Sequence, residues 1–375
     1  MDGMTGGFQA AHASGGGWRD MTEACLGQLA GAADGANLGF VYVTDALDGD
    51  LQSIVDALSQ RTAIRDWIGT VGFGVCASGV EYFDMPAMVL LVGALPADAF
   101  CVLPTVEGAD DGLPPQVADW VGAHTPMLGV VHGDPRNPEL ERVLESVQSA
   151  AGCFLVGGLT ASRGSLDQVA GAVTRGGVSG VLFSGATLVA TGLTQGCSPI
   201  GAVHEVTEGR DNVLATIDNR PAFEVFKEEI GELLARDLSK IEGYVHVALP
   251  IAGSDTGDYV VRNLLGVDPE KGHIAIADRV ATGDRVMFVR RDGTSAMADL
   301  KRMLADVKRR AGTQPKAALY FSCIARGPNL FGAGSVELGT IAEALGEVPL
   351  AGFFANGEIS NSRLYGYTGV IALFL

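Results

Sequence analysis

Four short polar loops carry residues whose types and placement suit binding or catalysis. Each loop directly follows a strand-like apolar run, in the segments "CASG", "LTASRG", "CIARG" and "ANGEIS". Ligands of α/β sheets usually lie at the carboxyl ends of strands, so we expect the four loops to line one polar cavity. The candidate ligand-binding residues in these loops are Cys76, Ser78, Thr160, Ser162, Cys323, Arg326, Asn356 and Glu358.

Cysteines in glycine-rich surroundings offer a second kind of chemistry. Cys76, Cys197 and Cys323 each stand at a predicted strand end or turn, a placement compatible with a reactive thiolate. A thiol-dependent enzyme would also need a base, and no histidine lies within the same motifs. The alternative is that these are small buried residues. The six cysteines form no C-x-x-C pair, so neither a disulfide framework nor a metal site is predicted.

Repeated elements are expected to position the loops. The segment 137–152 has the pattern of an amphipathic helix, with Asn137 as N-cap and Gly152 as its end, and a strand-like run and a polar loop follow it. Helical spacing also occurs at 51–58, 300–307 and 338–345, each time before a strand and a loop. Two such units precede residue 165 and two follow residue 299, which suggests two related halves.

Further strand-like runs follow three of the loops, in "MPAMVLLVGAL", "GVSGVLFSGATLVATGL" and "TGVIALFL". Helices that feed mixed sheets with many hairpins favour an α+β fold, a layered α/β sandwich, over a doubly wound parallel sheet. We expect a flexible tail over residues 1–35, because its start is rich in Gly, Ala and Ser. An N-terminal domain would then span 36–240 and a C-terminal domain 241–375.

Composition limits the classes of partner. The formal net charge is −18 and the pI about 4.6, so nucleic acid and anionic membrane surfaces would be repelled. Apolar runs such as "AMVLLVGAL" are too short to cross a bilayer, and the N-terminus lacks the regions of a signal peptide. A cytoplasmic protein is therefore expected, with no nucleic-acid or membrane partner.

Six segments together resemble the ordered landmarks of the FIST family, with its N-terminal and C-terminal domains. They are "TVGFGVCASG", "FLVGGLTASRG", "TQGCSPIG", "DYVVRNLLGVD", "FSCIARG" and "GFFANGEIS". The resemblance runs from about residue 37 to the C-terminus. It implies a sensory module of signal transduction that binds small ligands such as amino acids, and some members bind haem to sense nitric oxide. Because this chain has no appended output segment, its output would pass to a separate partner protein.

An amino-acid ligand would need a guanidinium for its carboxylate and a carboxylate for its ammonium group. Arg326 and Glu358 supply both charges from neighbouring loops, and we weigh that role against a structural salt bridge between the two. Arg262 is a second candidate for the carboxylate, or else lies on the solvated face of a short helix. Gln195 offers donor and acceptor atoms to a ligand, or else satisfies backbone groups of its own turn.

Overall fold

The computed structural model describes residues 7–29, 31, 35–231, 241, 243–251 and 258–375. The chain divides into two compact units, and the second is inserted into the first. Unit 1 comprises residues 1–194, 300–364 and 368–375, and unit 2 comprises residues 195–299 and 365–367. The predicted domain boundary near residue 240 falls inside unit 2, and residues 232–240 lie outside the described part of the chain.

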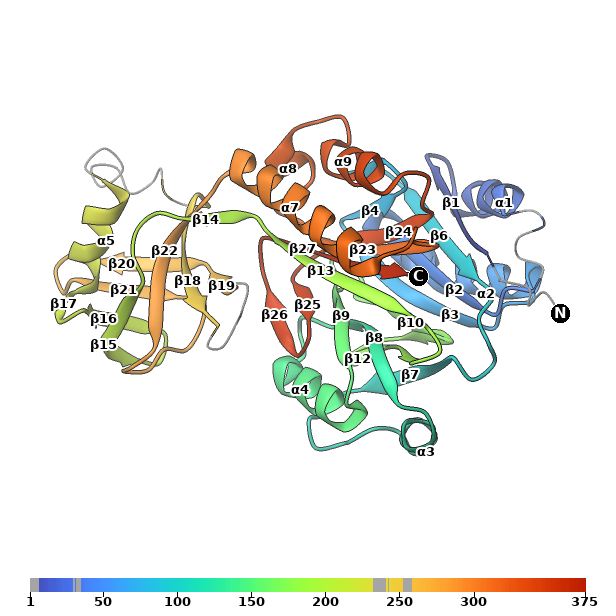
Figure 1. Cartoon of the computed structure of the whole chain (residues 1–375), viewed down its shortest axis with the longest axis horizontal. Coiled ribbons are helices and arrows are strands. Elements are labelled where there is room, and N and C mark those ends of the chain that lie inside the picture. Colours follow the sequence, from blue (N-terminus) through green and yellow to red (C-terminus); the bar gives the residue numbers. More distant parts are fainter. Residues whose placement is uncertain (1–6, 30, 32–34, 232–240, 242, 252–257) are drawn as a thin grey trace. The chain divides into compact units, whose positions relative to one another are not determined.

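Unit 1 contains three six-stranded mixed sheets among its described residues (Figure 1). The first sheet has the order β1 (Phe8–Ser14), β6 (Ala87–Gly93), β2 (Leu38–Thr44), β3 (Asp66–Gly72), β10 (Gln168–Ala170) and β11 (Ala172–Thr174). The second has the order β7 (Phe100–Val106), β12 (Val178–Ser184), β8 (Pro126–Gly133), β9 (Phe154–Leu159), β25 (Glu358–Ser360) and β26 (Arg363–Tyr365). The third has the order β13 (Val189–Gln195), β27 (Thr368–Phe374), β23 (Ala317–Cys323), β24 (Leu350–Ala355), β4 (Gly74–Ala77) and β5 (Val80–Phe83).

The three sheets repeat one plan. In each, two central strands are parallel (β2 with β3, β8 with β9, β23 with β24), and a later strand of the same repeat pairs antiparallel with the first of them. A helix connects the two parallel strands: α2 (Leu51–Arg61), α4 (Leu140–Ala151) and α9 (Val336–Leu345). The two strands beyond the second parallel strand form a hairpin that belongs to another repeat.

This hairpin exchange is cyclic. Strand β4 follows β3 of the first sheet but pairs with β24 of the third, and β25 follows β24 but pairs with β9 of the second. Strand β10 follows β9 and pairs with β3 of the first sheet, which closes the cycle. The sheet of each repeat is thus extended by a hairpin from another repeat. The two related halves expected from the sequence are not seen; the sheet topology shows three equivalent repeats.

A core cluster from all three sheets fills the space where their inner faces meet. Tyr42, His132 and Phe321 occupy the same register position on β2, β8 and β23. Their ring centroids lie 5.5, 6.2 and 6.3 Å apart and each pair meets edge to face, a favourable aromatic arrangement. The three rings mark the pseudo-threefold axis of unit 1.

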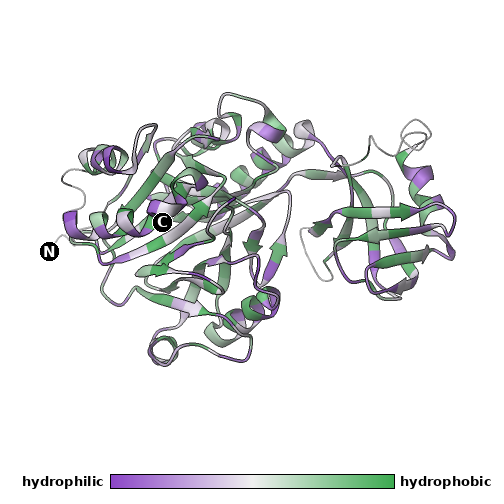
Figure 2. Ribbon diagram, turned by 180° about the vertical axis from the view of Figure 1, so that it is seen from behind, coloured by the Kyte–Doolittle hydropathy of each residue, from purple (hydrophilic) through white to green (hydrophobic). Residues whose placement is uncertain are grey.

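Helices cover the outer faces of these sheets. The helix α1 (Trp18–Gln28) and α2 pack their apolar sides on the first sheet, and α3 (Pro115–Ala123) and α4 pack on the second. Figure 1 shows α7 (Gly293–Ala311) and α9 against the third. In Figure 2 the strands between these helices are largely hydrophobic, as expected for strands buried on both faces.

The four predicted helices are confirmed in position. Helix α4 ends at Gly152 in the left-handed conformation (φ 64°), as its sequence indicates, although the helix begins at Leu140 and so starts later than the Asn137 cap implied. The segment "TVGFGV", expected as one strand, is instead split at Phe73 into β3 and β4, which belong to different sheets. The expected tail is also corrected in part: β1 pairs with β6, and α1 buries Met21 and Cys25.

Unit 2 holds a nine-stranded sheet and the helix α5 (Ala222–Ile230). Its main path runs β19 (Tyr259–Arg262), β18 (Val245–Pro250), β22 (Arg285–Arg291), β15 (His204–Arg210), β16 (Val213–Ile217), β21 (His273–Ile276) and β20 (Leu264–Asp268), while β14 (Cys197–Pro199) pairs with β22 and β17 (Arg220–Pro221) with β16. A separate core of aliphatic and aromatic side chains fills this unit. No helix among the described residues of either unit is long and apolar enough to span a bilayer.

Candidate functional site

A buried cluster of charged and polar side chains lies at the carboxyl end of β23. Arg326 follows that strand, and its side chain is 0% exposed. Its Nε atom donates to Oε1 of Glu337 at 2.7 Å, and Nη2 lies 2.7 Å from the same oxygen. Although burial lowers the pKa of Arg326, the charge of Glu337 raises it above its ordinary value. The guanidinium is therefore charged.

Glu337, at the start of α9, is the acceptor that holds this cluster together. Its two oxygens also accept hydrogen bonds from the Tyr320 hydroxyl (2.6 Å), the Ser322 hydroxyl (3.1 Å) and the Gly327 backbone N–H (2.9 Å). A carboxylate that accepts several hydrogen bonds and faces a guanidinium tolerates full burial. The sequence carries no signal for Glu337, because nothing in its helical context distinguishes it from a surface glutamate.

Glu358 lies on β25, in the hairpin that the third repeat extends to the second sheet. Its Oε2 accepts hydrogen bonds from the Thr368 backbone N–H (3.1 Å) and hydroxyl (2.8 Å). Burial raises the pKa of Glu358 to about 8, against the opposing effects of Thr368, Arg326 and Cys323. At neutral pH this carboxyl group is therefore largely protonated, although the charge of Arg326 acts on it.

Three polar atoms of the cluster are buried and make no hydrogen bond of good geometry among the described residues. They are Nη1 and Nη2 of Arg326 and Oε1 of Glu358, although Nη2 lies in ion contact with Glu337 and the Cys323 thiol lies beside the Glu358 carboxyl group. Buried polar atoms in folded proteins are nearly always satisfied, so each of these requires an explanation. Arg326 and Glu358 are not a mutual ion pair in this structure, since the partner of Arg326 is Glu337.

A four-residue helix, α8 (Pro328–Phe331), lies beside this cluster. The Phe331 ring centroid is 5.2 Å from the Arg326 guanidinium carbon. Gly327 precedes α8 with a φ of 51°, and a Cβ there would lie 2.8 Å from the Phe354 ring, so this position requires glycine. Gly332 and Gly334, after the helix, also have positive φ. The segment from Gly327 to Gly334, called the α8 segment below, thus covers Arg326 and has a glycine of positive φ at each end.

The predicted loop residues do not all meet at this cluster. Cys323 ends β23, Arg326 lies three residues beyond it, and Glu358 lies near both. Asn356 is exposed, and its backbone N–H donates to the Leu159 carbonyl. Because β4 runs antiparallel to β24, the "CASG" loop lies at the opposite end of that strand. There the Ser78 hydroxyl accepts from Leu350 N–H at 2.9 Å. The single cavity lined by four loops is therefore not formed as expected.

Cys76 lies inside the third sheet, on β4, opposite Gly352 of β24. Burial raises the pKa of Cys76 well above its ordinary value, and the nearby charges of Glu337 and Glu81 raise it further. A thiol in such surroundings stays protonated and is a poor nucleophile. Cys76 is therefore a packing residue.

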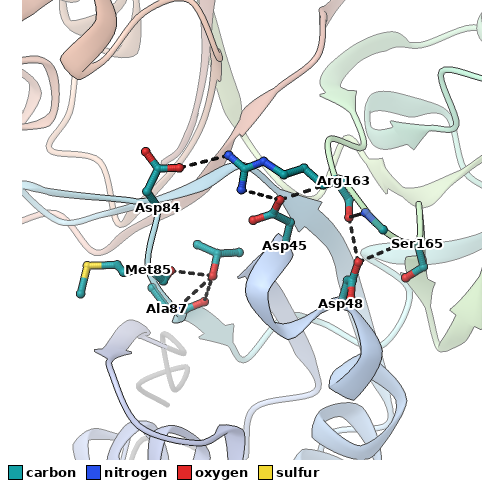
Figure 3. A network of polar contacts seen from close by, with 10 residues as sticks. Asp45, Asp48, Asp84, Met85, Ala87, Arg163 and Ser165 are labelled. Carbon is teal, nitrogen blue, oxygen red and sulfur yellow. Dashed lines mark hydrogen bonds and ion pairs between the residues drawn. The ribbon is translucent and has the colours of Figure 1, made fainter.

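The loop after β9 makes a second polar network, with Thr160 and Ser162 at its beginning. The Thr160 hydroxyl lies 2.7 Å from that of Thr70, in the interior. Ser162 donates to Oδ2 of Asp48 at 2.9 Å, in η1 (Asp45–Asp50). Figure 3 shows the neighbouring Arg163 reaching both Asp45 and Asp84 at 3.1 Å. These contacts connect the loop of the second repeat to the first repeat. The Ser162 hydroxyl already has a hydrogen-bond partner within the protein.

The last two predicted residues belong to unit 2. Gln195 donates from its side chain to the Tyr259 carbonyl at 3.2 Å, and its backbone N–H binds Asp299 at 2.7 Å. Arg262 lies on the strand β19, not on the short helix considered from the sequence, and its Nε donates to Asp278 at 2.7 Å. Both side chains thus have protein partners within their own unit.

Glu358 makes a pH-dependent contribution to stability that can be measured. Its folded pKa of about 8 exceeds the ordinary value of 4.5, so between these values the folded protein holds a proton that the unfolded chain releases. Its contribution is present in full below pH 4.5 and is lost as the pH rises through 8. Relative to the Glu358→Gln variant, the wild type should lose about 1.4 kcal/mol of unfolding free energy per pH unit between about pH 5.5 and 7.5.

Urea unfolding of both proteins across this range checks the prediction. Other titrating groups, such as Glu81 with its pKa raised by burial to about 7, affect both proteins alike and cancel in the difference. Parallel stability curves for the two proteins would show that Glu358 is not protonated in the folded state.

Comparison with known proteins identifies the family to which these landmarks belong. The FIST N domain model matches residues 37–220, and the FIST C domain model matches residues 222–361. The chain belongs to the FIST family. It is 31% identical over 344 residues to an uncharacterized protein of Mycobacterium tuberculosis strain H37Rv, with 87% of each chain covered. FIST domains are a family for which sensory and signalling roles have been proposed.

Two further matches are a relative that aligns over part of its length and a solved structure of low similarity. An uncharacterized protein of Mycobacterium bovis is 35% identical over 212 residues, and this chain covers 54% of its length, so the alignment spans about half of each. The solved structure of T. maritima PurL complexed with ADP aligns with 98% of this FIST protein and 71% of its own chain, at 12% identity and a TM-score of 0.25. That likeness is too low to carry an argument.

Proposed function

We propose that this FIST protein is a sensory module that binds a small carboxylate, amino acids included, at Arg326 and Glu358. The observation that carries the proposal is a pair of buried atoms, Nη1 of Arg326 and Oε1 of Glu358, that make no hydrogen bond of good geometry within the described part of the chain. Leaving such atoms unsatisfied costs about 1–3 kcal/mol each, and more for a charged group. A bound ligand that satisfies both is the simplest reason for a fold to keep them.

The protonation state of Glu358 favours a carboxylate as the group that binds here. With its pKa raised by burial to about 8, Glu358 is a hydrogen-bond donor at neutral pH, and Nη1 of Arg326 is also a donor. Two donors, one of them charged, suit a carboxylate acceptor. Gripping an ammonium group would instead require Glu358 to ionise. The pH dependence of affinity therefore separates the two modes of binding.

Ligand entry requires movement of the α8 segment, since Arg326 and Glu358 are both 0% exposed. Phe331 covers the guanidinium, and the glycines on both sides of α8 permit large changes of backbone angle at low cost. A ligand that binds only when this segment is displaced shifts the population toward the displaced state. We propose that a separate signalling protein reads this change.

Thermal and chemical unfolding of the full chain with acetate, succinate, L-alanine and L-alaninamide tests the proposal. Carboxylates should stabilise the protein, by about 2.7 kcal/mol at a hundred times the dissociation constant. Alaninamide, which keeps the ammonium group but has no carboxylate, should not. Affinity for acetate should fall as the pH rises past 8, when Glu358 loses its proton.

Two variants separate binding from folding. Glu358→Gln keeps a donor and should retain acetate binding while losing its pH dependence above 7. Arg326→Lys keeps the charge but not the planar fork of donors, and should weaken acetate binding at least about tenfold, or about 1.4 kcal/mol. Equal stabilisation by alaninamide and alanine, or none by any compound, would contradict the proposal. A ligand recovered chemically altered would favour the thiol-dependent enzyme instead.

A further inference from the structure

Unit 2 contains a cavity of about 560 Å³ that is separate from the cluster around Arg326. Residues of β18 and β20, with Tyr367, supply much of its lining. That volume is within the range of small-molecule sites. Its lining residues are apolar or uncharged, and the cavity therefore suits a different kind of ligand from a carboxylate.

His246 is the unusual residue of this cavity. It lies on β18, is 2% exposed, and neither of its ring nitrogens makes a hydrogen bond of good geometry among the described residues. Burial is the largest influence and lowers the pKa of His246 to about 4, together with the charge of Arg291 and against weak hydrogen bonding from the Gly243 backbone and the Asn263 side chain. The ring is thus neutral at physiological pH and presents one donor and one acceptor nitrogen.

An aromatic wall stands beside His246. The centroids of the His246 and Tyr367 rings are 4.4 Å apart, and the Tyr367 hydroxyl donates to Oδ1 of Asn263 at 2.7 Å. Tyr367 has a φ of 63°, which is costly for a bulky side chain and persists only where surrounding structure enforces it. The hydrogen bond to Asn263 orients the Tyr367 ring beside the His246 imidazole.

The rim of the cavity is apolar. Leu264, Leu265 and Val267 line it from β20, and the Leu265 side chain is 61% exposed. Leu265 thus presents an apolar side chain to solvent at the rim of the cavity. None of the described lining residues carries a formal charge at neutral pH, so burial of a charged ligand against them would cost hydration that these side chains do not replace with an opposite charge.

We propose that this cavity binds an uncharged planar molecule that carries a polar edge, such as an aromatic amide or a neutral heteroaromatic ring. Its polar edge pairs with the imidazole of His246, and its ring packs against Tyr367 and the leucines of the rim. This site is independent of the carboxylate site proposed in unit 1. A protein with both sites would respond to two ligands of different charge.

Benzamide is the probe for this site, and benzoate is its anionic match of nearly the same shape. Both are titrated into the full chain by saturation-transfer NMR, while the His246 ring proton signals report on the site itself. Benzamide should bind at least about tenfold more tightly than benzoate, a difference of about 1.4 kcal/mol, and should shift the His246 signals.

Three variants test the position of the site. His246→Phe keeps a ring of similar size but removes the polar edge, and should weaken benzamide binding at least about tenfold. Leu265→Glu places a charge at the exposed rim and should also weaken binding, with an unchanged urea midpoint. Leu188→Glu, at a side chain that is 65% exposed in unit 1, should leave binding unchanged.

The proposal is overturned if benzamide shows no saturable binding up to about 10 mM, well above the concentrations at which such fragments bind real sites. Equal binding of benzamide and benzoate would also overturn it, because the cavity would then not select against charge. Unchanged benzamide affinity in both His246→Phe and Leu265→Glu would place the binding elsewhere.

Discussion

Replacing Glu337 with Gln is expected to reduce the free energy of unfolding by about 3–5 kcal/mol. The substitution keeps the shape of the side chain but removes the charge that compensates the fully buried guanidinium of Arg326. It also disturbs the acceptor that binds Tyr320, Ser322 and Gly327. Urea unfolding monitored by circular dichroism measures the effect.

Two further variants make this result specific. Glu343→Gln lies on the same helix, α9, but is exposed, so its effect should stay within about 0.5 kcal/mol. The double variant Glu337→Gln with Arg326→Met removes both charges and should recover much of the loss, because the cost arises mainly from an unpaired buried charge. A loss below about 1 kcal/mol for Glu337→Gln alone, or no recovery in the double variant, would show that the pair is not buried as described.

Replacing Gly352 with Ala is expected to cost about 3 kcal/mol or more, or to prevent folding. A Cβ at this position would lie 1.7 Å from the carbonyl oxygen of Tyr320 on the adjacent parallel strand, a clash that only backbone movement can relieve. The equivalent glycines of the other repeats, Gly69 and Gly157, meet the same obstacle at 1.7 and 1.8 Å. At each of the three positions an added Cβ would meet a backbone carbonyl of the adjacent parallel strand.

Because the repeats are equivalent, the same substitution can be compared between two of them. Gly69→Ala in the first repeat should destabilise the protein as strongly as Gly352→Ala in the third. Gly122, in the helix α3, has open space where an added methyl group would lie, so Gly122→Ala should be neutral or stabilise by about 0.5–1 kcal/mol. Expression yields and urea unfolding midpoints of the three variants measure these effects on stability. A Gly352→Ala protein as stable as Gly122→Ala would contradict the strand geometry.

Much of the local structure follows from sequence patterns. The helical spacing at 51–58, 300–307 and 338–345 corresponds to α2, α7 and α9, and the apolar runs correspond to strands. These patterns are local, since helix and strand periodicity depend on neighbouring residues. The landmark motifs were also sufficient to indicate the FIST family. Counting units along the chain suggested two halves, however, because α7 looks like another member of the series.

The candidate site could be predicted only in part. Arg326 and Glu358 were singled out because opposite charges after two strands are visible in the sequence. Glu337 was not, because its role depends on where the helix α9 brings it in space. Cys76 and Ser78 were assigned to the wrong strand end, because a strand that leaves its sheet at Phe73 and joins another cannot be recognised from apolar periodicity.

The sequence alone therefore determined which segments are helical or extended, which family the chain belongs to, and which charged residues stand at strand ends. These depend on local spacing and residue type. The tertiary structure decided the cyclic exchange of hairpins, the pairing of Arg326 with Glu337 and the protonated state of Glu358. Each of these depends on burial and on contacts between residues distant in sequence, because the energy of a charge is set by the groups that surround it after folding.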